Sequence, residues 1–155
     1  MALTREQLTE LKAPFHANDH EFLNGMAYLT EFAITNRIED IDPAWSFIVR
    51  EVKQRDSFGD KTPYTVTVVA DLTIEGVTRT GIGQSLVRKA KSGSEANEAE
   101  KSAATDALKR AARLFGIGRY LLKLPNNISN VEQIGTWLNK VIELKKQRDS
   151  QQKAG

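Results

Sequence analysis

The chain has 155 residues, of which 40% are hydrophobic and 27% are charged, values that fit one soluble domain with a packed core. It contains no cysteine, which excludes disulfides and thiolate chemistry and fits a reducing compartment such as the cytoplasm. It has no apolar run long enough to span a membrane, and its N-terminus lacks the apolar core of a secretory signal. The net charge of +2 indicates nucleic acid only if the cations gather on one surface.

The N-terminal third is predicted to contain two helices. The first spans Thr4 to Lys12, with Thr4 as its N-cap and Gln7 at the capping-box position. The polar segment HANDHEFLNG follows, and we expect a loop or a short edge strand there. The second helix is predicted from Thr30 to Asp40.

Three strands follow, rich in β-branched residues and separated by turn signals. They predict an antiparallel meander over Trp45–Arg55, Tyr64–Ile74 and Val77–Leu86. Phe58–Lys61 and Glu75-Gly76 are expected to be its hairpin turns. Gly81 and Gly83 in the third strand indicate a bulge or the close approach of another backbone.

The longest predicted helix runs from about Glu95 to Phe115, is rich in alanine and ends at Gly116. A last helix is predicted from Val131 to about Arg148, followed by polar residues that we expect to fray. The predicted fold class is α+β: a three-stranded antiparallel β-meander packed against a long helix, with flanking N- and C-terminal helices. We expect residues 1–124 to form the core domain, and residues 125–155 to form the C-terminal helix and frayed tail.

Basic residues are concentrated in the second half of the long helix. Lys109 and Arg113 lie four residues apart and share one face, and Arg110 lies about one hundred degrees round the helix from Lys109. Acidic residues gather in the first half, and this polarity has an ordinary explanation, because it complements the helix dipole. The functional interpretation is a ridge whose cations neutralise DNA phosphates and release counterions. The spacing alone leaves both interpretations open.

Further basic residues flank this helix. Arg88, Lys89 and Lys91 form a basic loop before it, where solvation is the ordinary explanation. Arg79 on the preceding strand and Arg119 just past the helix are candidates to extend the same DNA-binding surface.

Proteins that bind single strands also use aromatic side chains as platforms for the bases. The candidates are Tyr64, Phe58, Tyr120 and Trp45. Trp45 opens a strand after a proline turn, which favours a place in the core. Tyr64 and Tyr120 remain open, because their hydroxyls favour partial exposure.

No pattern predicts catalysis or a cofactor. His16 and His20 have the spacing of zinc ligands on a helix, but their segment is not expected to be helical and lacks a third ligand. The Gly-Ile-Gly segments at 81–83 and 116–118 lack the Lys-Ser/Thr of a phosphate loop, which argues against ATP. The aspartates form no motif that would assemble two metal ions, which argues against a nuclease.

The stretch from Glu98 to Gly116, EAEKSAATDALKRAARLFG, strongly resembles the signature helix of the Rad-fifty-two superfamily of single-strand annealing proteins. The shared pattern is A-x-T-D-x-L-K-R-A-x-R-x-F-G. Trp45, the Gly-Ile-Gly of the third strand and the Gly-Ile-Gly-Arg-Tyr-Leu after the helix match as well. The last of these is most similar to the bacterial and phage branch that includes DNA-damage-response protein A. The resemblance covers about Thr30 to Leu124.

This resemblance implies an ATP-independent protein, not an enzyme, that binds and anneals single-stranded DNA in repair or recombination. It also implies a core similar in outline to double-stranded-RNA-binding domains, and a closed ring of many identical subunits with the strand in a basic groove. Lys109, Arg110 and Arg113 would contact phosphates in that groove. The family's further basic residue, on its first helix, falls near Ala33 here, and Arg37 is the nearest candidate to replace it.

Two other functions remain open at this point. A double-stranded-RNA-binding module has the same outline of helix, meander and helix. A metal-dependent nuclease is less favoured. For the leading function we expect single-stranded DNA and further copies of the chain as partners, no cofactor and no metal. We also expect a cytoplasmic location, at the nucleoid when the protein is bound to DNA.

Overall fold

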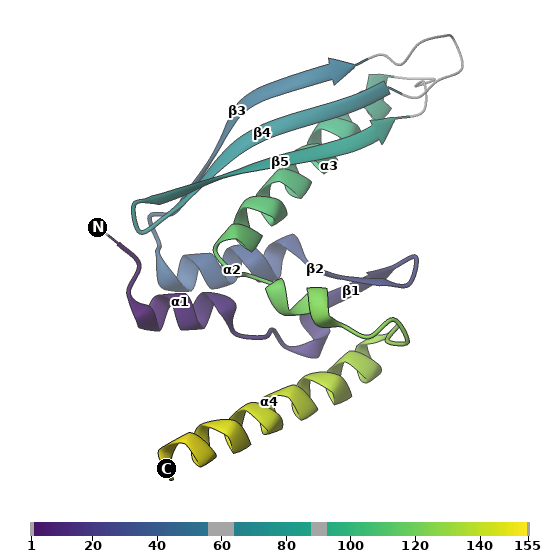
Figure 1. Cartoon of the computed structure of the whole chain (residues 1–155). Coiled ribbons are helices and arrows are strands. Elements are labelled where there is room, and N and C mark those ends of the chain that lie inside the picture. The colour runs from purple at the N-terminus through teal and green to yellow at the C-terminus, as the bar shows by residue number, and fades with distance from the viewer. Residues whose placement is uncertain (1, 56–63, 88–92, 155) are drawn as a thin grey trace.

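The computed structural model describes residues 2–55, 64–87 and 93–154, with side chains described for all of these except 93–97. Figure 1 shows a three-stranded sheet, the long helix α3 (Gly93–Leu114) crossing one of its faces, and the other helices and a small hairpin below. The predicted α+β class and the helix-covered meander are confirmed. Outside the described residues lie the expected turn at Phe58–Lys61, with the candidate aromatic Phe58, and the basic residues Arg88, Lys89 and Lys91.

Two short helices, α1 (Arg5–Lys12) and α2 (Glu31–Ile41), lie below the sheet in Figure 1. The Thr4 hydroxyl accepts a hydrogen bond from the Gln7 amide at 3.1 Å, and the Gln7 side chain accepts one from the Thr4 amide at 2.9 Å. Thr30 caps α2 through the same kind of hydroxyl bond. Both predicted helices are confirmed, because each threonine satisfies an amide that the first turn leaves free.

A small hairpin separates these two helices. A 3-10 turn (η1, Ala17–Asp19) leads into β1 (His20–Leu23), which pairs with β2 (Met26–Leu29). The connecting residues Asn24 and Gly25 have φ values of 51° and 76°, as a two-residue hairpin turn requires. The expected loop or single edge strand is therefore a two-stranded hairpin. The Asn-Gly pair between apolar residues was the signal for it.

The main sheet has the order β3 (Ser46–Arg55), β4 (Tyr64–Ile74) and β5 (Val77–Val87), with antiparallel pairing throughout. Glu75 and Gly76 form the predicted turn between β4 and β5, with φ values of 49° and 73°. Alternate residues of β4 are buried, and these face α3. From Thr65 onward, β4 alternates between partly buried and buried positions, as expected for a strand with one face in the core.

Helix α3 lies against β5 with almost no space between the two backbones. A Cβ atom on Gly81 would lie 2.0 Å from the Ala107 carbonyl oxygen, and one on Gly83 would lie 2.0 Å from the Ala103 carbonyl oxygen. Ala103, Ala107 and Ala111 are all fully buried at this contact. The predicted close approach is confirmed. It fixes the rotation of α3 about its own axis, and so determines which residues point away from the sheet.

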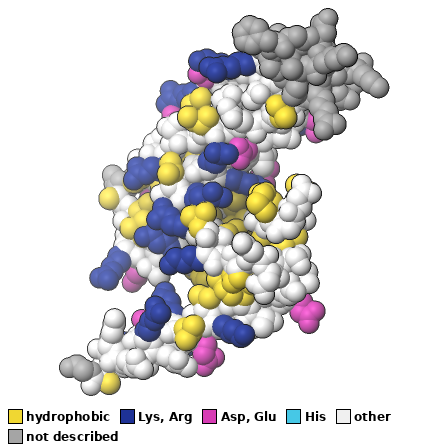
Figure 2. Space-filling view, turned by 45° about the vertical axis from the view of Figure 1, so that its right-hand side comes forward, with side chains coloured by type: hydrophobic (Ala, Val, Ile, Leu, Met, Phe, Trp, Pro, Cys, Tyr) yellow, Lys and Arg dark blue, Asp and Glu magenta, His cyan; other side chains and the backbone are white. Residues whose placement is uncertain are grey.

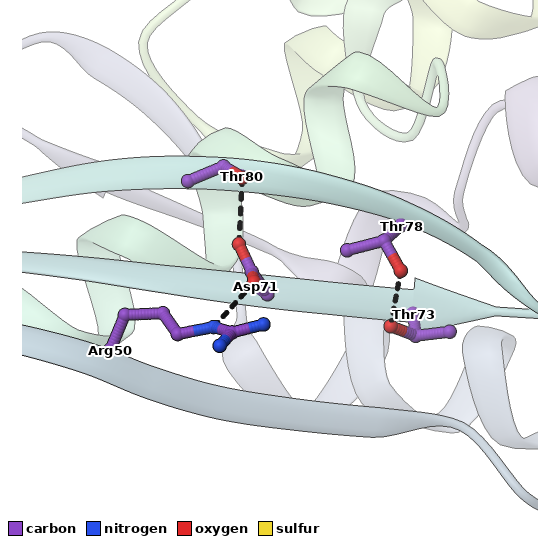
Figure 3. Close-up of polar contacts among 5 residues, drawn as sticks. All are labelled: Arg50, Asp71, Thr73, Thr78 and Thr80. Carbon is purple, nitrogen blue, oxygen red and sulfur yellow. Dashed lines mark hydrogen bonds and ion pairs between the residues drawn. The ribbon is translucent and has the colours of Figure 1, made fainter.

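The other face of the sheet carries polar links between strands, drawn in Figure 3. Asp71 on β4 accepts a hydrogen bond from the Thr80 hydroxyl at 2.6 Å and pairs with Arg50 at 2.7 Å. The Thr73 and Thr78 hydroxyls lie 2.8 Å apart. The Thr80 bond and then the Arg50 contact hold the pKa of Asp71 below its ordinary value. These links connect all three strands on the face opposite α3.

The chain ends with the 3-10 turn η2 (Arg119–Lys123) and the helix α4 (Val131–Lys153). Ile134 and Leu138 bury the first half of α4 against the back of the hairpin. The helix ends at Lys153, beyond the predicted end near Arg148, and includes polar residues for which fraying was expected. Those residues include Gln and Lys, which favour a helix, and neither Gly nor Pro interrupts them before the end of α4. None of the described helices has the length and apolarity needed to cross a membrane.

Candidate nucleic-acid interface

The basic half of α3 borders a cleft with a volume of about 530 Å³, which we call the basic cleft. The β1–β2 hairpin, the chain that follows α3 and Ile34 of α2 complete its lining. Figure 2 shows Lys and Arg side chains gathered along the middle of one face of the molecule, beside hydrophobic side chains. The lining includes Asp106, Lys109, Arg110 and Arg113 of α3, Gly25, Met26, Ala27, Tyr28 and Leu29 of the hairpin, and Ile117, Leu121, Leu122, Leu124 and Pro125.

Lys109 and Arg113 are the cations of the basic cleft that have no ion-pair partner among the described side chains. Lys109 is partly buried and Arg113 is exposed. They are one helical turn apart, which separates them by about 6 Å along the axis. Two unpaired cations at this separation can each meet a different phosphate of one strand. The structure thus brings together two of the residues that the sequence singled out.

Arg110 also lines the basic cleft, but Asp106 balances part of its charge. The Arg110 Nε donates to the Asp106 carboxylate at 3.0 Å, and the same oxygen accepts the Gln84 amide of β5 at 3.0 Å. Asp106 therefore ties α3 to the edge of the sheet and holds the Arg110 guanidinium in place. The pair is largely exposed, so its contribution to stability is small.

The threonine of the signature helix also has a place in the fold. The Thr105 hydroxyl donates to the Glu31 carboxylate at 3.0 Å, which links α3 to the first turn of α2. The Thr-Asp pair of the signature thus positions α3, and the Lys-Arg pair that follows it faces the basic cleft.

Arg37 does not belong to the basic cleft. Its guanidinium donates to the carbonyls of Ala13 and Pro14 and lies 3.4 Å from the centroid of the Phe15 ring. Burial is the main cause that lowers the pKa of Arg37. These two hydrogen bonds fasten the segment after α1 to α2, the helix that carries Arg37. The expected phosphate contact has no support from this position.

Arg79 and Arg119 are exposed but are not among the residues that line the basic cleft. The Arg79 guanidinium lies 5.7 Å from the centroid of the Phe115 ring and donates to the Thr78 carbonyl. Arg119 donates to the carbonyls of Arg113 and Leu114 at 3.1 and 3.5 Å, which caps the end of α3. A helix ends with free carbonyls, and Arg119 satisfies two of them.

The candidate aromatic platforms are largely taken up by the fold. Tyr64 packs against the buried cluster that includes Val66, Val68 and Ala103, and Trp45 packs against the one that includes Ile38, Leu72 and Leu108, as expected for the core. The Tyr120 hydroxyl lies 2.6 Å from His20 Nε2 and accepts the Phe15 amide at 3.3 Å. Burial raises the pKa of Tyr120 to about 12. None of these three rings is among the residues that line the basic cleft.

Both ring nitrogens of His20 are hydrogen-bonded within the fold, whereas His16 is exposed. His20 is buried, and its Nδ1 lies 3.1 Å from the Ala17 carbonyl while its Nε2 meets Tyr120. Because a carbonyl only accepts, Nδ1 carries the proton and Nε2 accepts from the Tyr120 hydroxyl. Burial lowers the pKa of His20 and so favours this neutral form. Within residues 2–55, 64–87 and 93–154, no three His, Asp or Glu side chains are grouped to hold a metal ion.

The hairpin side of the basic cleft was not predicted from the sequence. Met26 and Tyr28 line the cleft from β2, and Leu122 lines it from η2. Reading the Asn-Gly pair as a hairpin turn would have placed Met26 and Tyr28 on the same side of a strand. The distance between the hairpin and α3 in the chain would still have hidden their proximity.

The comparisons with known proteins agree with the signature helix. The family model described as Rad52/22 family double-strand break repair protein matches residues 4–148. The chain belongs to the Rad52/22 family. This membership confirms the resemblance that the signature helix indicated.

Two relatives carry the name single-stranded DNA-binding protein DdrA. The one from Deinococcus radiodurans is 42% identical over 101 residues, which cover 64% of this chain and 41% of the relative. The one from Deinococcus deserti is 39% identical over 105 residues, which cover 64% of this chain and 43% of the relative. The matched part is thus less than half the length of either relative, and the predicted similarity to the DdrA branch is confirmed.

Proposed function

We propose that the chain binds single-stranded DNA and promotes the annealing of complementary strands in DNA repair, without ATP and without covalent chemistry. The observation that carries the proposal is the basic cleft, in which Lys109 and Arg113 present cations that no described carboxylate neutralises. The names of the family and of the DdrA relatives agree with it. Contacts to phosphates position a strand without reading its sequence.

The mechanism follows from where the charge lies. The cations of α3 neutralise successive phosphates and release their counterions, which lowers the repulsion between two DNA strands. A rigid helix keeps those cations in fixed positions, so the bound strand is extended rather than coiled. Complementarity is then tested by base pairing between two bound strands, and the protein needs no base code.

We also propose that the chain assembles with further copies of itself into a ring and works in the cytoplasm. Strand β3 is at the edge of its sheet and has no outer partner strand among the described residues. Ile48, Val49 and Val52 of β3 are about half exposed. An unpaired edge beside apolar side chains favours pairing with another copy.

Fluorescence anisotropy with a labelled oligo-dT tests the binding proposal. Lys109→Ala and Arg113→Ala should each weaken binding several-fold at fixed salt, and their thermal unfolding should stay near that of the parent protein. Lys145→Ala is the matched control, because Lys145 is an exposed cation on α4 outside the basic cleft. Unchanged affinity in both cleft variants would show that the strand binds elsewhere.

The order α2, β3, β4, β5, α3 has the outline of a double-stranded-RNA-binding domain, which supports one alternative function. Competition between duplex RNA and oligo-dT for the same protein separates the two. A preference for duplex RNA that survives the loss of Lys109 and Arg113 would favour the alternative.

A further inference from the structure

The two sides of the basic cleft differ completely in charge. Its four charged lining residues, Asp106, Lys109, Arg110 and Arg113, all come from α3. Every lining residue contributed by the hairpin and by the chain after α3 is uncharged, and most are apolar. A cleft for phosphates alone would gain from cations on both sides. The asymmetry instead matches a single strand, which has charged phosphates on one side and bases on the other.

The uncharged side of the basic cleft also exposes large apolar side chains to solvent. Met26 is 58% exposed and Leu122 is 69% exposed, and both line the basic cleft. Apolar side chains in water are unfavourable, and a flat base that covers them removes that cost. Charge complementarity places the phosphates on α3, which leaves the bases for the hairpin side.

Strand alternation identifies the aromatic residue on this side. Ala27 and its cross-strand partner Phe22 pack against the buried cluster of Ile128, Ile134 and Leu138, behind the hairpin. Neighbouring residues of a strand point to opposite faces, so Met26 and Tyr28 lie on the face that does not pack there. Tyr28 is thereby separated from the core that holds Ala27 in place.

The hydroxyl of Tyr28 differs from that of Tyr120. The Tyr120 hydroxyl is fastened by His20 and by the Phe15 amide, whereas the described side chains and backbone offer Tyr28 no hydrogen-bond partner. A tyrosine whose ring borders a cleft and whose hydroxyl is free of the fold can lie flat against a base.

We propose that the hairpin forms the base-facing side of the basic cleft and that Tyr28 stacks on a base of the bound strand. The inference rests on the proposed single-strand binding and adds the orientation of that strand. It also gives the cleft a means of selecting single strands. In a duplex the bases are stacked and paired inside, so none is free to meet Tyr28.

The test compares oligo-dT with an abasic oligodeoxynucleotide of the same length, because the two present the same phosphates. The parent protein should prefer oligo-dT by about tenfold, the range expected for one stacked base. Tyr28→Ala should lose most of that preference, and Tyr28→Phe should restore it. Lys109→Ala should weaken binding of both oligonucleotides and keep their ratio.

A second readout separates stacking from a change in fold. A 2-aminopurine base placed in the oligonucleotide should change its fluorescence on binding to the parent protein and much less on binding to Tyr28→Ala. If the parent protein binds both oligonucleotides equally, with dependence on Lys109, the stacking proposal is wrong and single-strand binding stands. Equal loss of both ligands in Tyr28→Ala would likewise overturn stacking. If the parent protein binds neither oligonucleotide, the proposed function itself fails.

Discussion

The two sides of α3 show how one helix serves both the fold and the proposed function. The side against β5 carries small alanines, which let the helix backbone approach Gly81 and Gly83 within contact distance. The side toward the basic cleft carries Lys109 and Arg113, whose long side chains need open space. The tight side fixes the rotation of the helix, and that rotation directs the cations into the cleft. Position along α3 alone therefore does not assign a residue's role.

The largest effect should come from filling the contact on the tight side. In Gly83→Ala the new Cβ would lie 2.0 Å from the Ala103 carbonyl oxygen and 2.3 Å from the Ala107 amide nitrogen. Both are backbone atoms that cannot move aside, so we expect a loss of about 3 kcal/mol or more in the free energy of unfolding. Urea denaturation measures this loss.

Gly25→Ala is the control for that substitution. Gly25 differs from Gly83 in having a positive φ, of +76°, and nothing lies within 4 Å of its added Cβ. Its cost should be limited to backbone strain, about 1 kcal/mol. If the two variants were equally stable, the contact between α3 and β5 would not be what fixes the helix.

An intermediate effect should come from substituting Arg37. This substitution compares a cation that binds within the fold with the cations of the basic cleft. Arg37→Ala removes the bonds to the Ala13 and Pro14 carbonyls and the contact with the Phe15 ring. We expect a loss of about 2 kcal/mol in unfolding free energy. The affinity for oligo-dT should change by less than about twofold, because Arg37 is not among the residues that line the basic cleft. If the variant kept its stability but bound oligo-dT much more weakly, Arg37 would have to be assigned to the DNA-binding surface.

The smallest effect should be a change of stability with pH, caused by protonation of the buried His20. Burial lowers the pKa of His20 below its ordinary 6.5, so the unfolded chain binds a proton that the folded chain does not. Stability should therefore be full above pH 6.5 and decline as the pH falls below it. His20→Gln should reduce this decline between pH 7.5 and 5.5, as measured by thermal unfolding. A decline as large in the variant would assign it to another group.

Much of the fold followed from local signals in the sequence. Threonine caps located α1 and α2, β-branched runs located the three strands, and the Gly-Ile-Gly of β5 indicated the close backbone contact. These features depend on neighbouring residues, so they can be read directly. The helical repeat likewise predicts that Lys109 and Arg113 share one face, because residues four apart on a helix are neighbours.

Contacts between distant parts of the chain could not be predicted. Arg37 was a candidate for the DNA surface because the related family has a basic residue on its first helix, but the carbonyls that Arg37 binds lie some twenty residues earlier. Tyr120 was left open as a platform, yet its partner His20 is one hundred residues away. Tyr28 was missed because only the folded hairpin brings it to the cleft that α3 borders. Charge and aromaticity name candidates, and tertiary contacts decide which of them are free.

The salt dependence of oligo-dT binding tests the central claim most directly. For single strands the logarithm of the affinity falls with the logarithm of salt concentration by about 0.7 for each phosphate neutralised. The variant that carries Lys109→Ala and Arg113→Ala together should therefore show a slope smaller in magnitude by about 1.4 than the parent protein. It should keep the same unfolding temperature. An unchanged slope in a folded variant would contradict the assignment of these two cations to the DNA backbone.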